Sequence, residues 1–478
     1  MRKFLFLLGL TIFSSNPLFP QFIEDALRYT IPNSMITPYS ASFGVSFYGL
    51  SDDVSGLFIN PAGLLYIPKG ELSIGLGFTR NIAESEYLFN KIERRSNSSY
   101  LTHVGFATPI REFGNKVVGG IAYFHENNFL NYFDYSAFNP TSSLINSLAQ
   151  YGPKDTNTNI PYFLWLANNK FYTPVKDSVK QDVFVNEDGG LHNITGGFAV
   201  SIAKNVSVGV SLTGKFGKFT YYREFKESDI LNKYNFFDSI NYSNIDFNNF
   251  TLKENLTQKV SGITGSIGVI GTWEKFFRFG VTIKFPTYYE VEEEFRRDAY
   301  AQFDDGWKPN PYEPKENSYN SYKITTSFVY AAGVSLKILD FLFAAGVEYF
   351  DVTQLRFSDA PPEIDQLNSR IVRELVGQVK WGFGVQYSPP ILPFEFRASY
   401  SSITSPYTAD IPNATTNIYS VGMAVYLASN VRLEPTFQYT TNSILRTNYT
   451  TAETDPAKNY KLNLSPIKIA LQLTYRGF

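Results

Sequence analysis

Apolar and polar residues alternate along most of this chain, from Glu71 onward. In the first such segment Leu72, Ile74, Leu76 and Phe78 share one face, and Ser73, Gly75, Gly77 and Thr79 share the other. The same alternation recurs at 206–213, 277–285, 431–440 and 467–476. Successive side chains of a strand point to opposite faces, so this pattern predicts strands with one apolar and one polar face.

The number of strands distinguishes a membrane barrel from a soluble sandwich. We find about fourteen segments of roughly ten residues, an even number of membrane-crossing length. They begin near Glu71, Ser99, Asn115, Gly190, Asn205, Thr257, Lys275, Ser321, Asp340, Gly377, Phe394, Thr416, Asn430 and Ser465. A soluble sandwich explains the alternation as well, but it does not require this number or length.

The connectors between these segments alternate strictly between short and long. Short turns lie at 111–115, 204–205, 273–275, 338–340, 388–393 and 429–430, and long polar connectors such as 81–98, 127–189 and 221–256 lie between them. In an antiparallel barrel every long connector then falls on the outer rim, with the short turns in the periplasm. The sequence therefore predicts an all-β fold, a roughly 14-stranded antiparallel transmembrane β-barrel over residues 71–478.

The first residues have the composition of a secretory signal. Arg2 and Lys3 precede a short apolar run, and small residues follow near Ser15. We predict that residues 1–21 are removed on export, since the run is too short to span a bilayer. No later run of about 18 apolar residues occurs, so the expected location is the bacterial outer membrane, with lipid against the apolar face.

Residues 22–70 carry too little apolar bulk to fold alone. The inward faces of the strands are mostly Ser, Thr, Gly and Ala, with scattered charged residues. A barrel this wide is not filled by side chains alone. We therefore expect residues 22–70 to form a hatch of short helices that plugs the lumen.

The hatch contains two candidate capped turns. Asp52 and Asp53 precede an apolar run and can accept free helix N–H groups. Asn60 suits an N-cap, because proline disfavours helical geometry in the residue before it, and Pro61 suits the first helical position. These local features are explained equally well by two capped turns without a function and by a gate. Acid–base chemistry by the two aspartates is not favoured, because no partner motif is visible.

At this point the chain resembles the FadL/TodX family of outer-membrane transporters for hydrophobic compounds. The resemblance is carried by Asp52, Asp53, Phe58, Asn60, Pro61, Ala62 and Gly63, with support from the leader, the strand number and the terminal Phe478. It implies that these residues belong to a hatch or gate. It also implies that outer loops capture a hydrophobic small molecule, such as a long-chain fatty acid, which leaves sideways after the hatch moves.

Two further positions follow from this resemblance. Gly119 and Gly120 weaken the third strand and are candidates for a bulge at the lateral opening, although a bend that eases packing against the plug is equally consistent. Tyr475 and Phe478 are the candidate signal for the barrel-assembly machinery. Tyr475 is in phase with the outward residues and Phe478 is not, so we expect a terminal bulge.

The long connector at 127–189 is rich in aromatic residues. Phe129, Tyr132, Phe133, Phe163 and Trp165 are candidates for ligand capture in an apolar funnel. A self-packed cap over the barrel explains the same residues equally well.

Composition excludes several other functions. The net charge of −2 gives no basic surface for nucleic acid. The chain has no cysteine, so disulfides and thiolate chemistry are excluded. His103, His125 and His192 are far apart in sequence, so no metal site is expected, and no serine-elbow motif is present. We expect no cofactor, no enzymatic activity and a monomer.

The leading hypothesis is therefore an outer-membrane channel for passive uptake of hydrophobic molecules. The alternative is a shuttle protein that binds exported protein cargo, because barrels of type IX secretion carry a similar NPAG segment.

Overall fold

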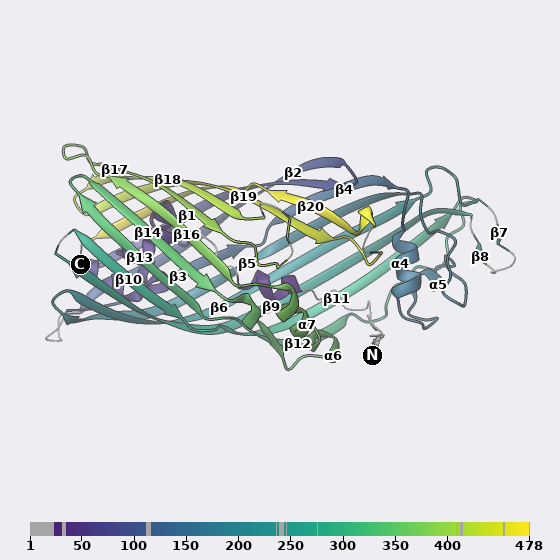
Figure 1. Cartoon of the computed structure of the whole chain (residues 1–478), viewed down its shortest axis with the longest axis horizontal. Coiled ribbons are helices and arrows are strands. Elements are labelled where there is room, and N and C mark those ends of the chain that lie inside the picture. The colour runs from purple at the N-terminus through teal and green to yellow at the C-terminus, as the bar shows by residue number, and fades with distance from the viewer. Residues whose placement is uncertain are drawn as a thin grey trace, which may run out of the picture.

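The computed structural model describes residues 23–30, 35–110, 116–235, 237–238, 243–244, 246–274, 276–408, 410–411, 414–452 and 455–477. The predicted leader, the turn at 111–115 and Phe478 lie outside these residues. Antiparallel strands close into a 14-stranded barrel with short helices near the N-terminus, so the predicted fold class is confirmed (Figure 1).

Several wall strands are broken into two named segments. The strands are β1 (Glu71–Tyr87), β2 (Asn90–Ile110), β3 (Val117–Asn128), β4 (Asn131–Asn139), β5 (Val179–Ala203), β6 (Val206–Ser228), β7 (Phe237–Asp238), β8 (Ser243–Asn244), β9 (Phe247–Trp273), β10 (Phe277–Lys284), β11 (Tyr288–Phe303), β12 (Ser318–Thr325), β13 (Val329–Ile338), β14 (Phe341–Phe350), β15 (Arg356–Ser358), β16 (Gln378–Tyr387), β17 (Phe394–Ile403), β18 (Thr416–Ala428), β19 (Val431–Thr447), β20 (Asn459–Leu464) and β21 (Ile467–Arg476). The helices are α1 (Ile23–Arg28), α2 (Pro38–Phe43), α3 (Gly56–Ile59), α4 (Leu144–Tyr151), α5 (Ile160–Phe163), α6 (Pro362–Asp365) and α7 (Leu367–Glu374), with 3-10 turns η1 (Gly44–Gly49), η2 (Pro61–Tyr66), η3 (Val352–Gln354) and η4 (Pro456–Lys458). No helix in this part of the chain is long and apolar enough to cross a membrane.

The wall closes where the first strand meets the last. β1 pairs with β2 on one side and with β21 on the other, where Glu71 lies opposite Arg476. The alternating faces are oriented as the sequence predicts. Leu76 is 62 % exposed on the outside, whereas Ser73 is fully buried on the inside.

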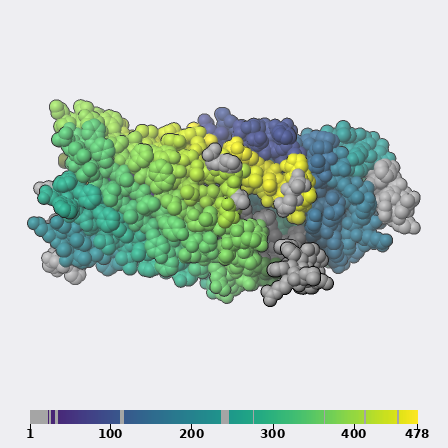
Figure 2. Space-filling view, viewed as in Figure 1, coloured from purple at the N-terminus to yellow at the C-terminus, as the bar shows by residue number. Residues whose placement is uncertain are grey.

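The wall of the barrel is higher on one side than on the other, because its strands differ in length. β5, β6 and β9 have 25, 23 and 27 residues, whereas β13, β14 and β16 have 10 each. Crossing a bilayer takes about 9–11 residues per strand, so the longer strands continue far beyond the membrane. This taller region is the blue and teal end of Figures 1 and 2, opposite the end that carries the short turns and the C-terminus.

The predicted long connectors are wrong where the strands continue. The stretch predicted as a connector at 81–98 is strand, with a tight turn at Leu88 and Phe89. Outside the membrane the outward residues need not be apolar. The alternation that marks a strand is therefore lost from the sequence, although the pairing continues.

The hatch occupies the lumen near the short-turn end. Helices α2 and α3 and turns η1 and η2 lie inside the wall, drawn in purple in Figure 1. The lumen of the taller half is instead filled by aromatic and aliphatic side chains, including Tyr87, Phe133, Tyr135, Phe225 and Phe247. The predicted small, polar inner face is therefore limited to the wall that surrounds the hatch.

Candidate functional site

Seven wall glycines lie directly beneath the hatch, and we call them the glycine girdle. They are Gly209, Gly268, Gly280, Gly333, Gly346, Gly384 and Gly422. A Cβ atom at Gly209 would lie 2.3 Å from the Pro61 carbonyl carbon, and one at Gly280 would lie 2.3 Å from the Tyr48 carbonyl oxygen. No real Cβ approaches that closely, so hatch backbone and wall backbone are in direct contact.

The NPAG tetrapeptide rests on this girdle. Asn60 is the N-cap of η2, with its Oδ1 accepting the Ala62 N–H at 3.2 Å, and Pro61 occupies the first turn, as predicted. Asn60 Nδ2 also donates to the Tyr48 carbonyl oxygen at 3.1 Å. A Cβ at Gly63 would lie 2.1 Å from the Ser51 carbonyl oxygen. Each residue of the motif therefore serves close backbone packing.

Polar contacts join the hatch to β10 and to the seam between β1 and β21. Arg278 donates to Asp52 Oδ2 at 3.2 Å. Arg476 donates to the Asp52 carbonyl oxygen at 2.9 Å and to Glu71 Oε2 at 2.6 Å. Glu71 Oε1 accepts the Val54 N–H at 2.9 Å. The pair that closes the barrel thus also holds the hatch.

Asp53 is completely buried in the hatch. Its carboxylate accepts the Ser55 N–H at 2.9 Å, so it caps this turn as predicted, and it contacts Thr37 Oγ1 at 3.2 Å. Burial and then the nearby Glu71 carboxylate raise the pKa of Asp53 to about 7, with smaller contributions from Glu434 and Asp52. Asp53 is therefore neutral when the hatch is docked at acidic pH.

Hatch docking should weaken as the pH rises. In water the pKa of Asp53 returns to about 3.9, so the docked state holds a proton that the undocked state releases. The stabilisation is complete below about pH 4 and is lost as the pH rises through 7, at most about tenfold per pH unit. We expect conductance in planar bilayers to increase between pH 5 and 8.5, and Asp53→Asn to flatten this dependence. An unchanged pH profile in the variant would contradict this role.

Phe58, on α3 of the hatch, faces a set of inward lysines of the wall. This lysine cluster consists of Lys215, Lys284, Lys380 and Lys468 from β6, β10, β16 and β21. The Nζ atoms of Lys284 and Lys215 lie 4.4 and 5.6 Å from the Phe58 ring centroid. Lys215 pairs with Glu126 at 2.8 Å, whereas Lys284 and Lys380 form no ion pair with any described residue. The cluster therefore has excess positive charge.

A small cavity separates this cluster from the hatch. It has a volume of about 40 Å³ and is lined by Tyr48, Phe58, Lys284, Glu348 and Lys380, among others. It is large enough for water but not for a ligand. The described conformation is therefore closed at this level.

An apolar chamber lies on the outer side of the lysine cluster. This chamber is a packed cluster of buried side chains from the wall, including Phe129, Phe219, Tyr289, Tyr322 and Phe357, together with residues of α1. Ile23 and Leu27 of α1 are buried there. Tyr289 belongs to this chamber and lies 5.9 Å from Lys215 Nζ, so the chamber and the cluster are contiguous.

The third strand bends at Glu126 rather than at Gly119 and Gly120. The register of β3 runs unbroken past both glycines on both sides, and it shifts between His125 and Asn127. Pairing with β2 ends at Phe124, although both strands continue. The strands beside the glycine pair thus carry no extra residue there, and the role of Gly119 and Gly120 in a lateral opening stays a prediction.

The predicted capture residues do not form one surface. Phe129 is buried in the apolar chamber. Phe133 is buried among the aromatic and aliphatic side chains that fill the lumen of the taller half. Tyr132 packs on Phe184 at 5.1 Å. Phe163 and Trp165 are exposed and contact Tyr312 and Trp307 at the rim. Phe163 and Trp165 are therefore the most accessible of the five, Tyr132 is partly exposed, and Phe129 and Phe133 are buried.

Two other predictions concern isolated residues. Tyr475 lies on β21 opposite Leu72 and remains the candidate assembly signal, whereas Phe478 lies outside the described residues. The histidines are closer than their spacing in the sequence suggests, because His125 and His192 are cross-strand partners with Nδ1 atoms 3.3 Å apart. No group of three or more metal-ligating side chains forms in the described part of the chain.

A closed antiparallel barrel whose lumen is plugged by its own N-terminal segment defines the class of this protein. The chain has the fold of the FadL/TodX transporters, as the NPAG resemblance implied. It is similar to a Pseudomonas aeruginosa FadL homologue with 9 % identity over 90 % of this chain and 98 % of that one, TM-score 0.56. It is also similar to the Pseudomonas putida toluene transporter TodX, with 11 % identity over 92 % and 97 %, TM-score 0.55.

A third similar structure is the Ralstonia pickettii toluene transporter TbuX, with 10 % identity over 92 % of this chain and 98 % of that one, TM-score 0.53. These proteins carry the names of transporters, not of enzymes. No protein-family model and no curated protein matches the sequence.

Proposed function

We propose that this protein is an outer-membrane channel for passive uptake of hydrophobic molecules with an anionic head, such as long-chain fatty acids. The solved structures with this fold include a FadL homologue and toluene transporters. Those names support a hydrophobic ligand. The choice between an acid and a hydrocarbon comes from the lumen of this chain.

The observation that carries the proposal is the apolar chamber that leads directly to the lysine cluster. An alkyl chain is stabilised by about 0.8 kcal/mol for each buried CH₂ group. A carboxylate gains charge-assisted hydrogen bonds from lysine ammonium groups. Lys284 and Lys380 have no ion-pair partner among the described residues, so they are available to a ligand. Glu348 lines the same cavity and offsets part of this charge, and a neutral hydrocarbon would leave the rest uncompensated.

Ligand entry requires that α1 leave the apolar chamber. Its side chains Ile23 and Leu27 occupy the space that an acyl chain would take. α1 belongs to the same hatch segment as Thr37, which contacts Asp53, so displacement of α1 should weaken the seating of the rest of the hatch. Binding outside the hatch is thereby coupled to loosening of the hatch.

The exit is proposed at the β3 bend. Lys215 of the lysine cluster pairs with Glu126 at the point where β2 and β3 separate. A ligand head bound by Lys215 would release Glu126, which lies just beyond the last pair of β2 and β3, His103 with Phe124.

Uptake in a bacterial host that lacks its own fatty-acid channel tests this function. Cells that express the full chain should accumulate labelled oleate at least about tenfold faster than cells with an empty vector, and labelled toluene far less so. Equal rates for both probes would contradict an anionic ligand, and no uptake of either would contradict a channel. Recovery of secreted proteins by pull-down, without oleate uptake, would favour the cargo-binding alternative.

The exit is tested in the same assay. Because the chain has no cysteine, Tyr100→Cys and His125→Cys, whose native rings lie 4.5 Å apart, can be joined across the β2–β3 gap by a short bis-maleimide linker. Linking should abolish oleate uptake, and each single variant with the same reagent serves as control. Full uptake after linking would exclude this exit.

A further inference from the structure

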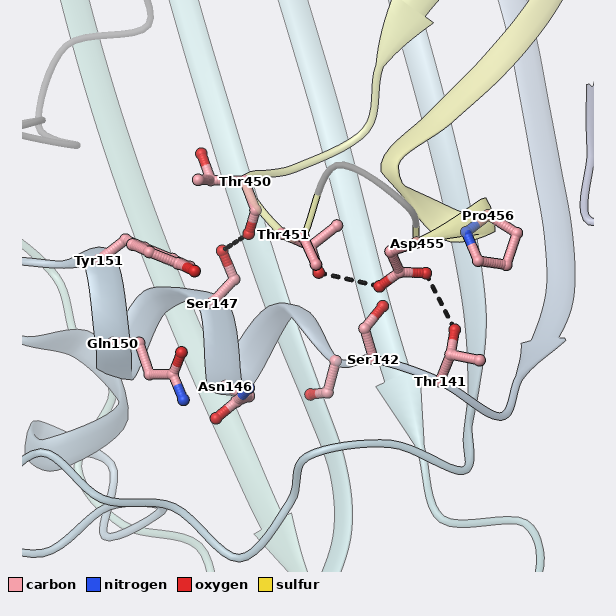
Figure 3. A pocket seen from close by; sticks show the side chains of 12 residues that line it. Thr141, Ser142, Asn146, Ser147, Gln150, Tyr151, Thr450, Thr451, Asp455 and Pro456 are labelled. Carbon is pink, nitrogen blue, oxygen red and sulfur yellow. Dashed lines mark hydrogen bonds between the residues drawn. The ribbon is translucent and has the colours of Figure 1, made fainter. Parts of the chain in front are cut away.

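A polar cavity of about 400 Å³ lies at the outer end of the molecule. Its walls are the turn after β4, helix α4 and the loop between β19 and β20 (Figure 3). None of its lining residues lines the cavity at the lysine cluster or belongs to the apolar chamber. It is therefore a separate site, and the proposed uptake path does not use it.

The lining is polar and almost without charge. Half of the 12 lining residues are serine or threonine. The cavity is lined by Thr141, Ser142, Ser143, Asn146, Ser147, Gln150, Tyr151, Thr450, Thr451, Ala452, Asp455 and Pro456. No lysine, arginine or large aliphatic residue is among them. This composition suits neither an anion nor an apolar ligand.

Asp455, the one charged lining residue, is already satisfied. Thr141 and Thr451 donate hydroxyl hydrogen bonds to it at 2.9 and 2.8 Å, and the Ala457 N–H donates at 2.9 Å. Burial opposes its ionisation, but these bonds and one from Ser142 outweigh burial and hold the pKa of Asp455 below its usual range. The carboxylate stays negative and disfavours carboxylate, phosphate or sulfate ligands.

Three polar side chains of α4 face this space without a partner. Asn146, Gln150 and Tyr151 make no side-chain hydrogen bond to any described residue. Asn146 and Gln150 are four residues apart and therefore project from one face of the helix. Each amide both donates and accepts, and the Tyr151 ring is 42 % exposed. These three side chains, which Figure 3 labels on α4, are thus free to bind a ligand.

The cavity is held in shape from behind. Glu227 accepts the Leu144 N–H at 2.7 Å and the Ser143 hydroxyl at 2.7 Å, which fixes the start of α4. Ser147 donates to the Thr450 carbonyl oxygen at 2.6 Å and joins the helix to the opposite loop. A preformed site loses little free energy to ordering when a ligand binds.

We propose that this cavity binds a neutral saccharide. Adjacent sugar hydroxyls match the donor and acceptor pairs of Asn146 and Gln150, and the Tyr151 ring offers a face for stacking. An apolar ligand would leave these groups unpaired, at a cost of about 1–3 kcal/mol each when buried. The volume lies at the lower end of ligand sites and suits about one or two sugar rings. The saccharide comes either from the polysaccharide of the membrane surface or from the medium.

Ligand-observed saturation-transfer NMR on the full chain in detergent micelles tests this proposal. The probes are glucose, galactose, mannose, N-acetylglucosamine and maltose. We expect saturable binding of at least one sugar, weakened at least tenfold by Asn146→Ala with Gln150→Ala, and weakened separately by Tyr151→Ala. Asn157→Ala, an exposed amide outside the cavity, is the matched control and should bind as the native chain does.

Two results would overturn the proposal: no saturable binding of any probe, or equal binding by the double variant. A heat-modifiable gel shift verifies that each variant keeps its barrel. Competition distinguishes the two sources. Lipopolysaccharide that carries its polysaccharide, but not lipid A, should displace the sugar if the surface is the source, and neither should displace it if the sugar comes from the medium.

Discussion

Replacing Gly209 and Gly280 by valine should unseat the hatch and open the pore. A side chain at either position meets hatch backbone at 2.3 Å, and backbone cannot move aside without leaving the wall. Overpacking costs about 1–3 kcal/mol per site, so two sites together shift the docked-to-undocked ratio by about 30- to 20,000-fold. We expect a large rise in bilayer conductance and sensitivity of cells to antibiotics that the outer membrane normally excludes.

The control variants are Gly214→Ala and Gly271→Ala. Gly214 lies in β6, the strand of Gly209, and Gly271 lies in β9, the strand that pairs with β10 next to Gly280. A Cβ at either control position meets no atom within 4 Å. Their conductance should equal that of the native chain. A double valine variant that folds and remains as tight as the native barrel would show that the girdle does not seat the hatch.

Replacing Lys284 and Lys380 by methionine should remove most oleate uptake. Methionine keeps the length of the side chain but removes the positive charge. Each lost hydrogen bond to a charged group costs about 1.5–3 kcal/mol, so the apparent affinity should fall at least tenfold per residue. The half-saturating oleate concentration in the uptake assay measures this change.

Lys218→Met is the matched control, because Lys218 lies on β6 but is exposed on the outer side of the wall. Uptake of oleyl alcohol, which has the same chain and no charge, separates charge recognition from a general loss of structure. That uptake should remain unchanged or increase in the double methionine variant. An equal loss for the acid and the alcohol would contradict a role for the lysines in binding the head.

Much of the wall could be predicted because lipid imposes a simple rule on it. The outward residues from Leu72 to Phe78 face lipid and must be apolar, whereas the inward residues face the lumen and need not be. Apolar residues therefore recur at every second position of the sequence. The turns at 204–205, 273–275 and 429–430 coincide with observed strand ends for the same reason. Beyond the membrane the outward residues need not be apolar, so the part of β2 at 90–98 could not be recognised as strand from the sequence.

Within the candidate site, only the hatch residues could be predicted from the sequence. Asn60 and Pro61 are neighbours in sequence, so local capping identifies them. The lysine cluster combines residues of four strands that are more than 60 positions apart, and only register brings them together. A lone lysine at an inward position between apolar outward residues, as at Lys284 and Lys468, was the available signal. The β3 bend also depended on pairing, because two adjacent glycines mark flexibility without fixing where an extra residue falls.

The bond between hatch and closing seam has a consequence for the order of assembly. Residues 67–70 join the hatch to β1, and the pairing between Glu71 and Arg476, where the first and last strands meet, closes the barrel around it. A hatch in direct contact with the wall backbone at the glycine girdle could enter an already closed barrel only with difficulty. Assembly should therefore pair β1 with β21 around a hatch that is already in place. A barrel that closed before its hatch entered would be an unplugged pore in the membrane.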